Sequence, residues 1–175
     1  MIDVVQSMAE ERKVLRRGDG VGSFIDISDK LIESTVEIFT GMVMMEITVA
    51  GEPLSNLGPL QHFITGMVGL AGTQKGVLAV HFPDQVAKEV TGSFLGMEVD
   101  EINADVHDAI GEIANMLGGN LKTIFSIRGK DIQLSLPSTI SGEQYSFTSQ
   151  AEVDQIILPF KAPGGIFYVE VELEH

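Results

Sequence analysis

Residues 100–125, DEINADVHDAIGEIANMLGGNLKTIF, hold the clearest periodic pattern in the chain. Apolar side chains recur there every three or four residues, at Ile102, Val106, Ile110, Ile113, Leu117, Leu121 and Ile124. At about 3.6 residues per turn, this spacing places them along one stripe of an α-helix. The pattern therefore predicts a helix after Asp100 that buries this stripe in the core of a domain.

The opposite face of the predicted helix is polar. Asp108, Glu112 and Asn115 lie on it, and Gly119 follows one turn later. A carboxylate and a carboxamide three residues apart are neighbours on a helix surface. A glycine on that face lets a partner approach closely, although two adjacent glycines are equally typical of a helix end or bend. A solvated helix face carries the same residue types, so the functional and the purely structural interpretations both stay open.

The flanking sequence alternates between helical and extended patterns. One helix is predicted from Ser28 and Asp29, which offer N-cap side chains, and another runs from Pro83–Asp84 to about Leu95. Strands are predicted over residues 44–49, 61–71, 76–82, 131–136, 145–149, 153–161 and 166–172. The second and third of these form a hairpin, as do the last two. This order of elements predicts an α+β domain in which an antiparallel sheet carries helices packed on one face.

A weak internal repeat relates two of the predicted helices. Residues 33–42 align with residues 108–117, and Thr40 stands in the first segment where Asn115 stands in the second. Each helix then leads into β-like sequence, and the interval between them is too long for a solenoid repeat. The repeat therefore predicts a pseudo-twofold domain made of two related halves.

The composition limits the classes of function. The chain has 175 residues, a net charge of −14 and no cysteine. So acidic a surface repels phosphate backbones and anionic lipid, which disfavours nucleic-acid and membrane-surface roles. The lack of cysteine excludes disulfides, thiolate zinc sites and a cysteine nucleophile. The apolar stretch over residues 63–71 is too short to span a membrane, and no signal-peptide pattern opens the chain, so we expect a cytoplasmic protein.

The length and the position of the patterns predict a single domain. We expect it to cover residues 25–172. Residues 1–24 are interpreted as an N-terminal extension, because they are rich in charge and carry no core pattern. Residues 173–175, Leu-Glu-His, are typical of the start of an expression tag.

Taken together, Asp108, Glu112, Asn115 and Pro137 resemble the signature of the CheC/CheX/FliY phosphatase family. In that signature an acidic residue or a serine precedes a Glu and an Asn, and a proline follows about twenty-two residues beyond the Asn. The resemblance extends over residues 26–172 in the order of elements, so the predicted α+β domain is a CheC-like one. Because Thr40 replaces the amide in the first half, we expect one active centre per chain, which resembles CheX more than the two-centred CheC.

The resemblance implies that the chain dephosphorylates the phosphoaspartate of a CheY-type response regulator, in chemotaxis or a related two-component pathway. It implies that Asn115 orients the attacking water and that Glu112 pairs with a lysine of the receiver. Asp108, Gly119 and Pro137 would contact the partner. The phosphorylated receiver would supply its own Mg²⁺, so the resemblance implies no metal or cofactor held by this chain. It also implies a homodimer.

Other interpretations stay open. A non-catalytic adaptor of the same fold would dock a receiver or a flagellar switch component without chemistry. His62 and His81 lie in predicted strands among apolar residues, so we expect them to be structural. A cation held by acidic residues 101, 105 and 108 is conceivable, but such a cluster is more typical of a solvated surface.

Overall fold

The computed structural model describes residues 24–126 and 131–174 of the chain, so the predicted N-terminal extension lies outside the described residues except for Phe24. The helical elements are α2 (Phe24–Ile38), the π-helix η1 (Phe39–Val43), α3 (Asp84–Leu95) and α4 (Ala104–Phe125). The strands are β1 (Thr48–Val49), β2 (Leu60–Gly72), β3 (Gly76–Pro83), β4 (Ile132–Leu134), β5 (Ser138–Tyr145), β6 (Val153–Ala162) and β7 (Gly165–Glu174).

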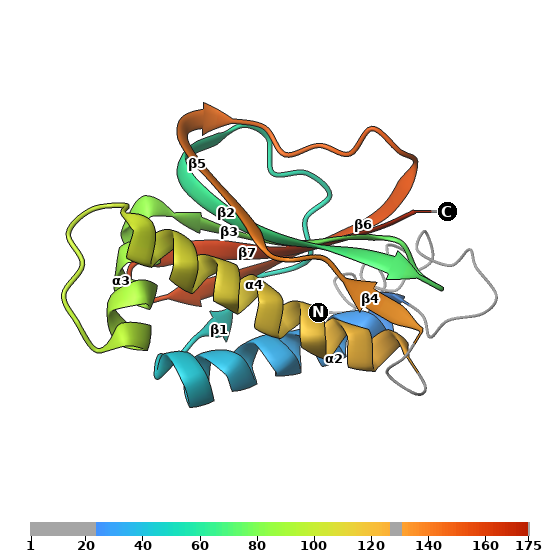
Figure 1. Ribbon diagram of the computed structural model, residues 1–175, viewed down its shortest axis with the longest axis horizontal. Coiled ribbons are helices and arrows are strands. Elements are labelled where there is room, and N and C mark those ends of the chain that lie inside the picture. Colours follow the sequence, from blue (N-terminus) through green and yellow to red (C-terminus); the bar gives the residue numbers. More distant parts are fainter. Residues whose placement is uncertain (1–23, 127–130, 175) are drawn as a thin grey trace, which may run out of the picture.

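The described elements form two layers (Figure 1). Helices α2, α3 and α4 lie on one face of an antiparallel sheet, so the predicted α+β arrangement is confirmed. The core lies between the layers and is centred on stacked rings. The ring centroid of Phe167 lies 4.9 Å from that of Phe39, 4.7 Å from that of Phe82 and 5.4 Å from that of Phe160. All of these side chains are fully buried, and they join β7 to η1, β3 and β6.

The strand order displays the relation between the two halves. Within the described residues, seven strands form one sheet in the order β1-β6-β7-β3-β2-β4, and β5 also pairs with β2. This order is symmetric about the central β3–β7 pair, because the hairpin β2–β3 of the first half lies beside the hairpin β6–β7 of the second. Each half also gives an edge strand to the other, β1 to β6 and β5 to β2. The predicted pseudo-twofold domain is confirmed, and neither half has its full sheet without the other.

Two predictions for the first half are wrong. Ser28 and Asp29 do not cap the first helix, because the chain is already helical from Phe24. The strand predicted over residues 44–49 is confined to the two residues of β1. Met44 takes a left-handed backbone conformation, with φ at 62°, where it ends the π-helix. This left-handed residue turns the chain at the end of the π-helix, and the strand starts only at Thr48.

Two predictions for the second half also need correction. The strand predicted over residues 145–149 is wrong, because β5 lies before it and pairs with β2 from Leu60↔Tyr145 to Met67↔Ser138. Most side chains of β5 are exposed, so no alternation of apolar and polar residues marks this strand in the sequence. The strand predicted over residues 131–136 is confined to β4.

The remaining elements match their predicted positions. Helices α3 and α4 and the hairpins β2–β3 and β6–β7 are confirmed. The glycine pair at residues 118 and 119 does not end α4. Strand β7 continues past residue 172: Leu173 is buried, and the backbone N–H of Glu174 donates to the carbonyl of Lys75 at 2.9 Å. These two residues therefore complete the strand, and their origin in an expression tag stays a prediction.

Candidate functional site

Helix α4 positions the predicted site by burying its opposite face. Its fully buried inner stripe consists of Val106, Ile110, Ile113, Leu117 and Leu121. The side chain of Asn103 caps the helix by accepting a hydrogen bond from the N–H of Val106 at 3.1 Å. Because the inner stripe packs against the sheet, the opposite face of α4 is directed outward.

The predicted polar residues share this outward face. Asp108 and Glu112 are exposed, and Asn115 is half-buried. At Gly119, apart from neighbouring residues of the helix's own backbone, no atom of the described part of the chain lies within 4 Å of the position that a Cβ would take. The face is therefore open to a partner one turn beyond Asn115, as the spacing predicted.

Pro137 is brought beside the same helix by close packing at two glycines. A Cβ added at Gly111 would lie 3.5 Å from Thr139 Cγ2 and 3.7 Å from Pro137 Cβ. A Cβ added at Gly118 would lie 3.6 Å from a methyl group of Leu134. The segment that joins β4 to β5 therefore runs alongside α4 (Figure 1). Pro137 is exposed there, beside the turn of α4 that carries the two carboxylates.

His107 of α4 contacts two hydroxyl groups of β5 and so holds this strand beside the helix. His107 Nδ1 lies 2.6 Å from Thr139 Oγ1, and His107 Nε2 lies 3.2 Å from Ser141 Oγ. Hydroxyl groups donate or accept, so either tautomer of the ring satisfies both contacts. This positioning role of His107 was not predicted, because no strand was predicted over residues 138–144.

The corresponding helix face in the first half differs from that of α4 in its last residues. Glu33, Glu37 and Thr40 are exposed, in the places of the second-half residues. Thr40, however, lies in the π-helix η1, which ends at Val43. The site of the first half therefore has a hydroxyl where the second has a carboxamide, and its helix ends soon afterwards, at Val43.

The sheet face away from the helices carries a buried network of polar side chains. Thr65 Oγ1 lies 2.7 Å from His81 Nδ1 and 2.8 Å from the hydroxyl oxygen of Tyr145. His81 Nε2 lies 2.7 Å from Glu170 Oε2, and Gln155 Nε2 donates to Glu170 Oε1. The network crosses the sheet from β5 to β6, and it was not predicted. Burial of His81 within it confirms the expectation that this histidine is structural.

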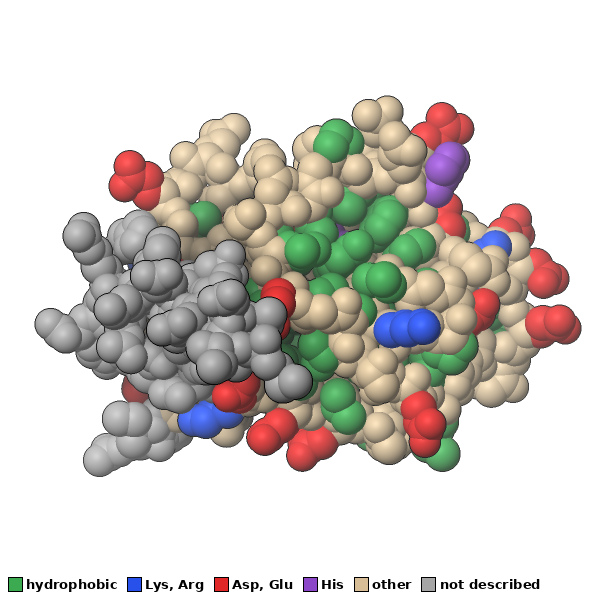
Figure 2. Space-filling model, turned by 180° about the vertical axis from the view of Figure 1, so that it is seen from behind, with side chains coloured by type: hydrophobic (Ala, Val, Ile, Leu, Met, Phe, Trp, Pro, Cys, Tyr) green, Lys and Arg blue, Asp and Glu red, His purple; other side chains and the backbone are tan. Residues whose placement is uncertain are grey.

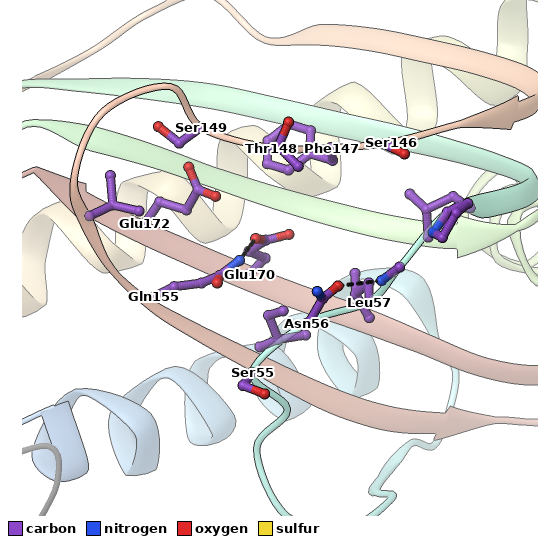
Figure 3. A pocket seen from close by; sticks show the side chains of 15 residues that line it. Ser55, Asn56, Leu57, Ser146, Phe147, Thr148, Ser149, Gln155, Glu170 and Glu172 are labelled. Atoms are coloured by element: carbon purple, nitrogen blue, oxygen red, sulfur yellow. Dashed lines mark hydrogen bonds between the residues drawn. The ribbon is translucent and has the colours of Figure 1, made fainter.

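A pocket of about 380 Å³ opens beside this network. Figure 3 shows it between the loops that carry Ser55 and Ser149, with Gln155, Glu170 and Glu172 contributed by β6 and β7. Figure 2 views the molecule from behind Figure 1 and shows hydrophobic side chains near the centre of this side, with acidic ones mostly around its edge. Burial, and secondarily the neighbouring Glu170 carboxylate, raises the pKa of Glu172 to about 7. The two carboxyl groups would repel a phosphoryl group, so the pocket does not suit the predicted chemistry.

The described residues contain neither a candidate cluster of metal ligands nor a helix that could span a membrane. Nowhere in residues 24–126 and 131–174 are three or more His, Cys, Asp or Glu side chains placed to hold a metal ion. The acidic residues near the start of α4 therefore form no such group. Among the helices described, none is long and apolar enough to cross a membrane.

Comparison with known proteins gives a consistent result. The family model described as chemotaxis phosphatase CheX matches residues 64–161. A curated relative, the CheY-P phosphatase CheX of Thermotoga maritima, is 28% identical over 91 residues, which cover 51% of this chain and 59% of that protein. The chain thus matches about three fifths of the relative's length.

Solved structures agree with the observed fold. The chemotaxis protein CheX from Desulfovibrio desulfuricans matches with a TM-score of 0.75 and 28% identity, covering 85% of this chain and 99% of that one. A chain in the CheX–CheY–BeF3–Mg²⁺ complex from Borrelia burgdorferi matches with a TM-score of 0.71 and 21% identity, covering 84% of this chain and 97% of that one. The second likeness bears on the fold alone.

Proposed function

The chain belongs to the CheX family of chemotaxis phosphatases, and from this premise we propose that it removes the phosphoryl group from the phosphoaspartate of a CheY-like receiver. The observation that carries the proposal is the outward face of α4, where Glu112 and Asn115 are adjacent and, among residues 24–126 and 131–174, no side chain covers Gly119. A partner as large as a receiver domain can approach such a face, whereas a small-molecule site needs a concave surface.

In the proposed reaction, Asn115 enters the active site of the receiver and holds a water molecule in line with phosphorus. A carboxamide donates and accepts hydrogen bonds but takes no proton near neutral pH, so it orients the water without acting as a base. The oxygen of the water bonds to phosphorus as the bond to the aspartate oxygen breaks. Inorganic phosphate and the free carboxylate of the receiver are the products. Positioning of this kind is a main source of rate in phosphoryl transfer.

Glu112 is proposed to pair with a lysine of the receiver and so set the register in which Asn115 enters. A carboxylate–ammonium hydrogen bond is stronger than a neutral one and is directional enough for this role. Asp108, Gly119 and Pro137 are proposed to contact the receiver around this pair. Mg²⁺ would belong to the phosphorylated receiver, where it neutralises charge on the phosphoryl group, and the chain would hold no cofactor.

The comparison with a relative supports the proposal from outside the chain. The Thermotoga maritima relative is named a CheY-P phosphatase. A homodimer, which the family resemblance implies, and the cytoplasmic location expected from the sequence complete the proposal.

The deciding experiment follows loss of phosphate from a phosphorylated receiver of the same genome, with and without this protein, at fixed Mg²⁺. We expect the protein to accelerate the loss at substoichiometric concentration. The alternative is a non-catalytic adaptor that docks a receiver or a flagellar switch component. Tight binding of the phosphorylated receiver with no acceleration would establish the adaptor and overturn the phosphatase. Light scattering of the free protein tests the homodimer.

A further inference from the structure

The most exposed of the large apolar side chains in the described residues belongs to Leu136, which is 87% exposed. It lies between β4 and β5, directly before Pro137. Single exposed leucines are common on protein surfaces and need no explanation on their own. Leu136 is distinguished by its position in the chain and by the hydrogen bonds that hold its backbone.

The backbone at Leu136 is held by its neighbour on one side. Ser135 exchanges hydrogen bonds with Gly69 of β2: its N–H donates to the carbonyl at 2.9 Å, and its Oγ accepts from the N–H at 2.8 Å. The same hydroxyl donates to the carbonyl of Leu136 at 2.9 Å. Pro137 restricts the backbone on the other side. The leucine is therefore presented to solvent from a fixed backbone, which lowers the entropy lost when a partner covers it.

The segment between β4 and β5 also determines the position of Leu136 along the axis of α4. It starts beside Gly118 and passes Gly111 at Pro137, so it runs antiparallel to the helix. Leu136 falls between these two levels, and Asn115 occupies the same interval on the helix. The exposed side chain of Leu136 thus belongs to the same level of α4 as the amide that is proposed to orient water.

We propose that Leu136 is an apolar docking residue for the phosphorylated receiver, buried by the receiver when Asn115 reaches the phosphoaspartate. This inference rests on the proposed function and adds a specificity contact to it. The charged groups on the same face, Asp108 and Glu112, are exposed carboxylates, and the chain as a whole carries a net charge of −14. Long-range attraction to a phosphorylated and Mg²⁺-bound site is therefore weak outside the single lysine contact. Burial of an apolar side chain supplies affinity that does not depend on charge.

The test is a comparison of Leu136→Ala with Leu54→Ala, an equally truncated leucine at the opposite edge of the sheet that is 38% exposed. We expect Leu136→Ala to raise KM for the phosphorylated receiver about tenfold or more, the effect of one buried leucine, with kcat within about twofold of wild type. Leu54→Ala should leave both constants unchanged, and Leu136→Met should restore most of the affinity. The loss in Leu136→Ala should persist at high salt, because the contact is apolar.

Binding separates failure of this inference from failure of the proposed function. Calorimetry with the receiver loaded with Mg²⁺ and beryllofluoride measures docking whether or not phosphate is released. Wild-type affinity in Leu136→Ala overturns the docking role even if the wild-type protein is an active phosphatase. Weakened binding with an inactive wild type supports the docking role and overturns the phosphatase. A change in the oligomeric state of Leu136→Asp, without loss of receiver binding in Leu136→Ala, assigns the leucine to a contact between copies of the chain and also overturns the inference.

Discussion

The helices α2 and α4 occupy equivalent places in the two halves of the domain, yet only one of them carries the complete constellation. Both present two exposed carboxylates to solvent, at Glu33 and Glu37 in α2 and at Asp108 and Glu112 in α4. Beyond the carboxylates the two differ. Helix α2 passes into a π-helix that stops at Val43, whereas α4 continues to Phe125 and is flanked by the β4–β5 segment.

This difference teaches that the fold and the site are separable. Strand exchange across the β3–β7 pair requires both halves, so the sheet keeps its symmetry. The outward face of a helix makes no such contribution to the core, and each half is free to carry different side chains there. The following changes test how far the chemistry is confined to the second half.

The largest effect is expected for Asn115→Ala. It removes the only carboxamide on the proposed catalytic face of α4, and we expect the rate of receiver dephosphorylation to fall about 100-fold or more, the range for one group acting at a transition state. Because Asn115 lies outside the buried stripe, the unfolding midpoint should change little. A rate within about twofold of wild type would contradict the role given to this residue.

Glu112→Ala is expected to act on docking, with a smaller effect. If the carboxylate pairs with a receiver lysine, KM should rise about tenfold, because a charge-assisted hydrogen bond is lost. Glu37→Ala, the same change in the first half, is the matched control and should leave KM unaltered. Steady-state kinetics over a range of receiver concentrations separates the two constants, and an unchanged KM in Glu112→Ala removes the docking role.

Adjacent glycines within α4 sharpen the contrast between its inner and outer sides. In Gly118→Ala the new Cβ would lie 2.7 Å from Val68 Cγ2, so we expect a loss of about 1–3 kcal/mol in the free energy of unfolding. In Gly119→Ala the new methyl group contacts none of the described residues outside its own helix, and helix propensity should stabilise the fold by about 0.5–1 kcal/mol. Urea unfolding of the two variants checks both signs. Equal effects would show that α4 is not pressed against β2 at Gly118.

The two faces of the sheet also differ, because one packs against the helices and the other carries the buried polar network. The pH dependence of stability tests the polar face. The folded-state pKa of Glu172 is raised from 4.5 to about 7, so the folded protein holds a proton that the unfolded chain releases. The stability contributed by this proton is fully present below about pH 4.5 and is lost as pH rises to about 7. Glu172→Gln, which keeps the shape without the charge, should remove this part of the pH dependence. Unfolding free energies at pH 5 and pH 8 compare the two proteins, and an identical pH slope would contradict the raised pKa.

The smallest effect is expected in the first half. Thr40→Ala should leave dephosphorylation within about twofold of wild type and change stability by about 0.5 kcal/mol or less, as is usual for an exposed side chain. A large loss of activity would mean that the active half has been assigned wrongly, or that both halves form one composite site. Thr40→Asn in an Asn115→Ala background asks whether the amide alone restores activity in the first half. We expect no measurable recovery, because the helix there ends within the π-turn.

Local patterns were sufficient for the elements whose side chains alternate between core and solvent. The stripe of α4 and the hairpins β2–β3 and β6–β7 were predicted because burial on one face imposes a period on the sequence. Strand β5 was placed wrongly because most of its side chains are exposed. The length of β1 was overestimated, because no sequence pattern predicts the left-handed backbone conformation of Met44 before it.

The candidate site divides in the same way. Asp108, Glu112 and Asn115 share a face because helix geometry is local, and residue spacing alone predicts their adjacency. That Pro137 and Leu136 lie beside them depends on contacts between residues distant in sequence, at Gly111 and Gly118. The polar network under the opposite sheet face, and with it the raised pKa of Glu172, likewise exists only once strands from both halves are paired. The period of a helix is a property of a few consecutive residues, whereas close approach and desolvation are properties of the packed chain, and only the tertiary structure can supply them.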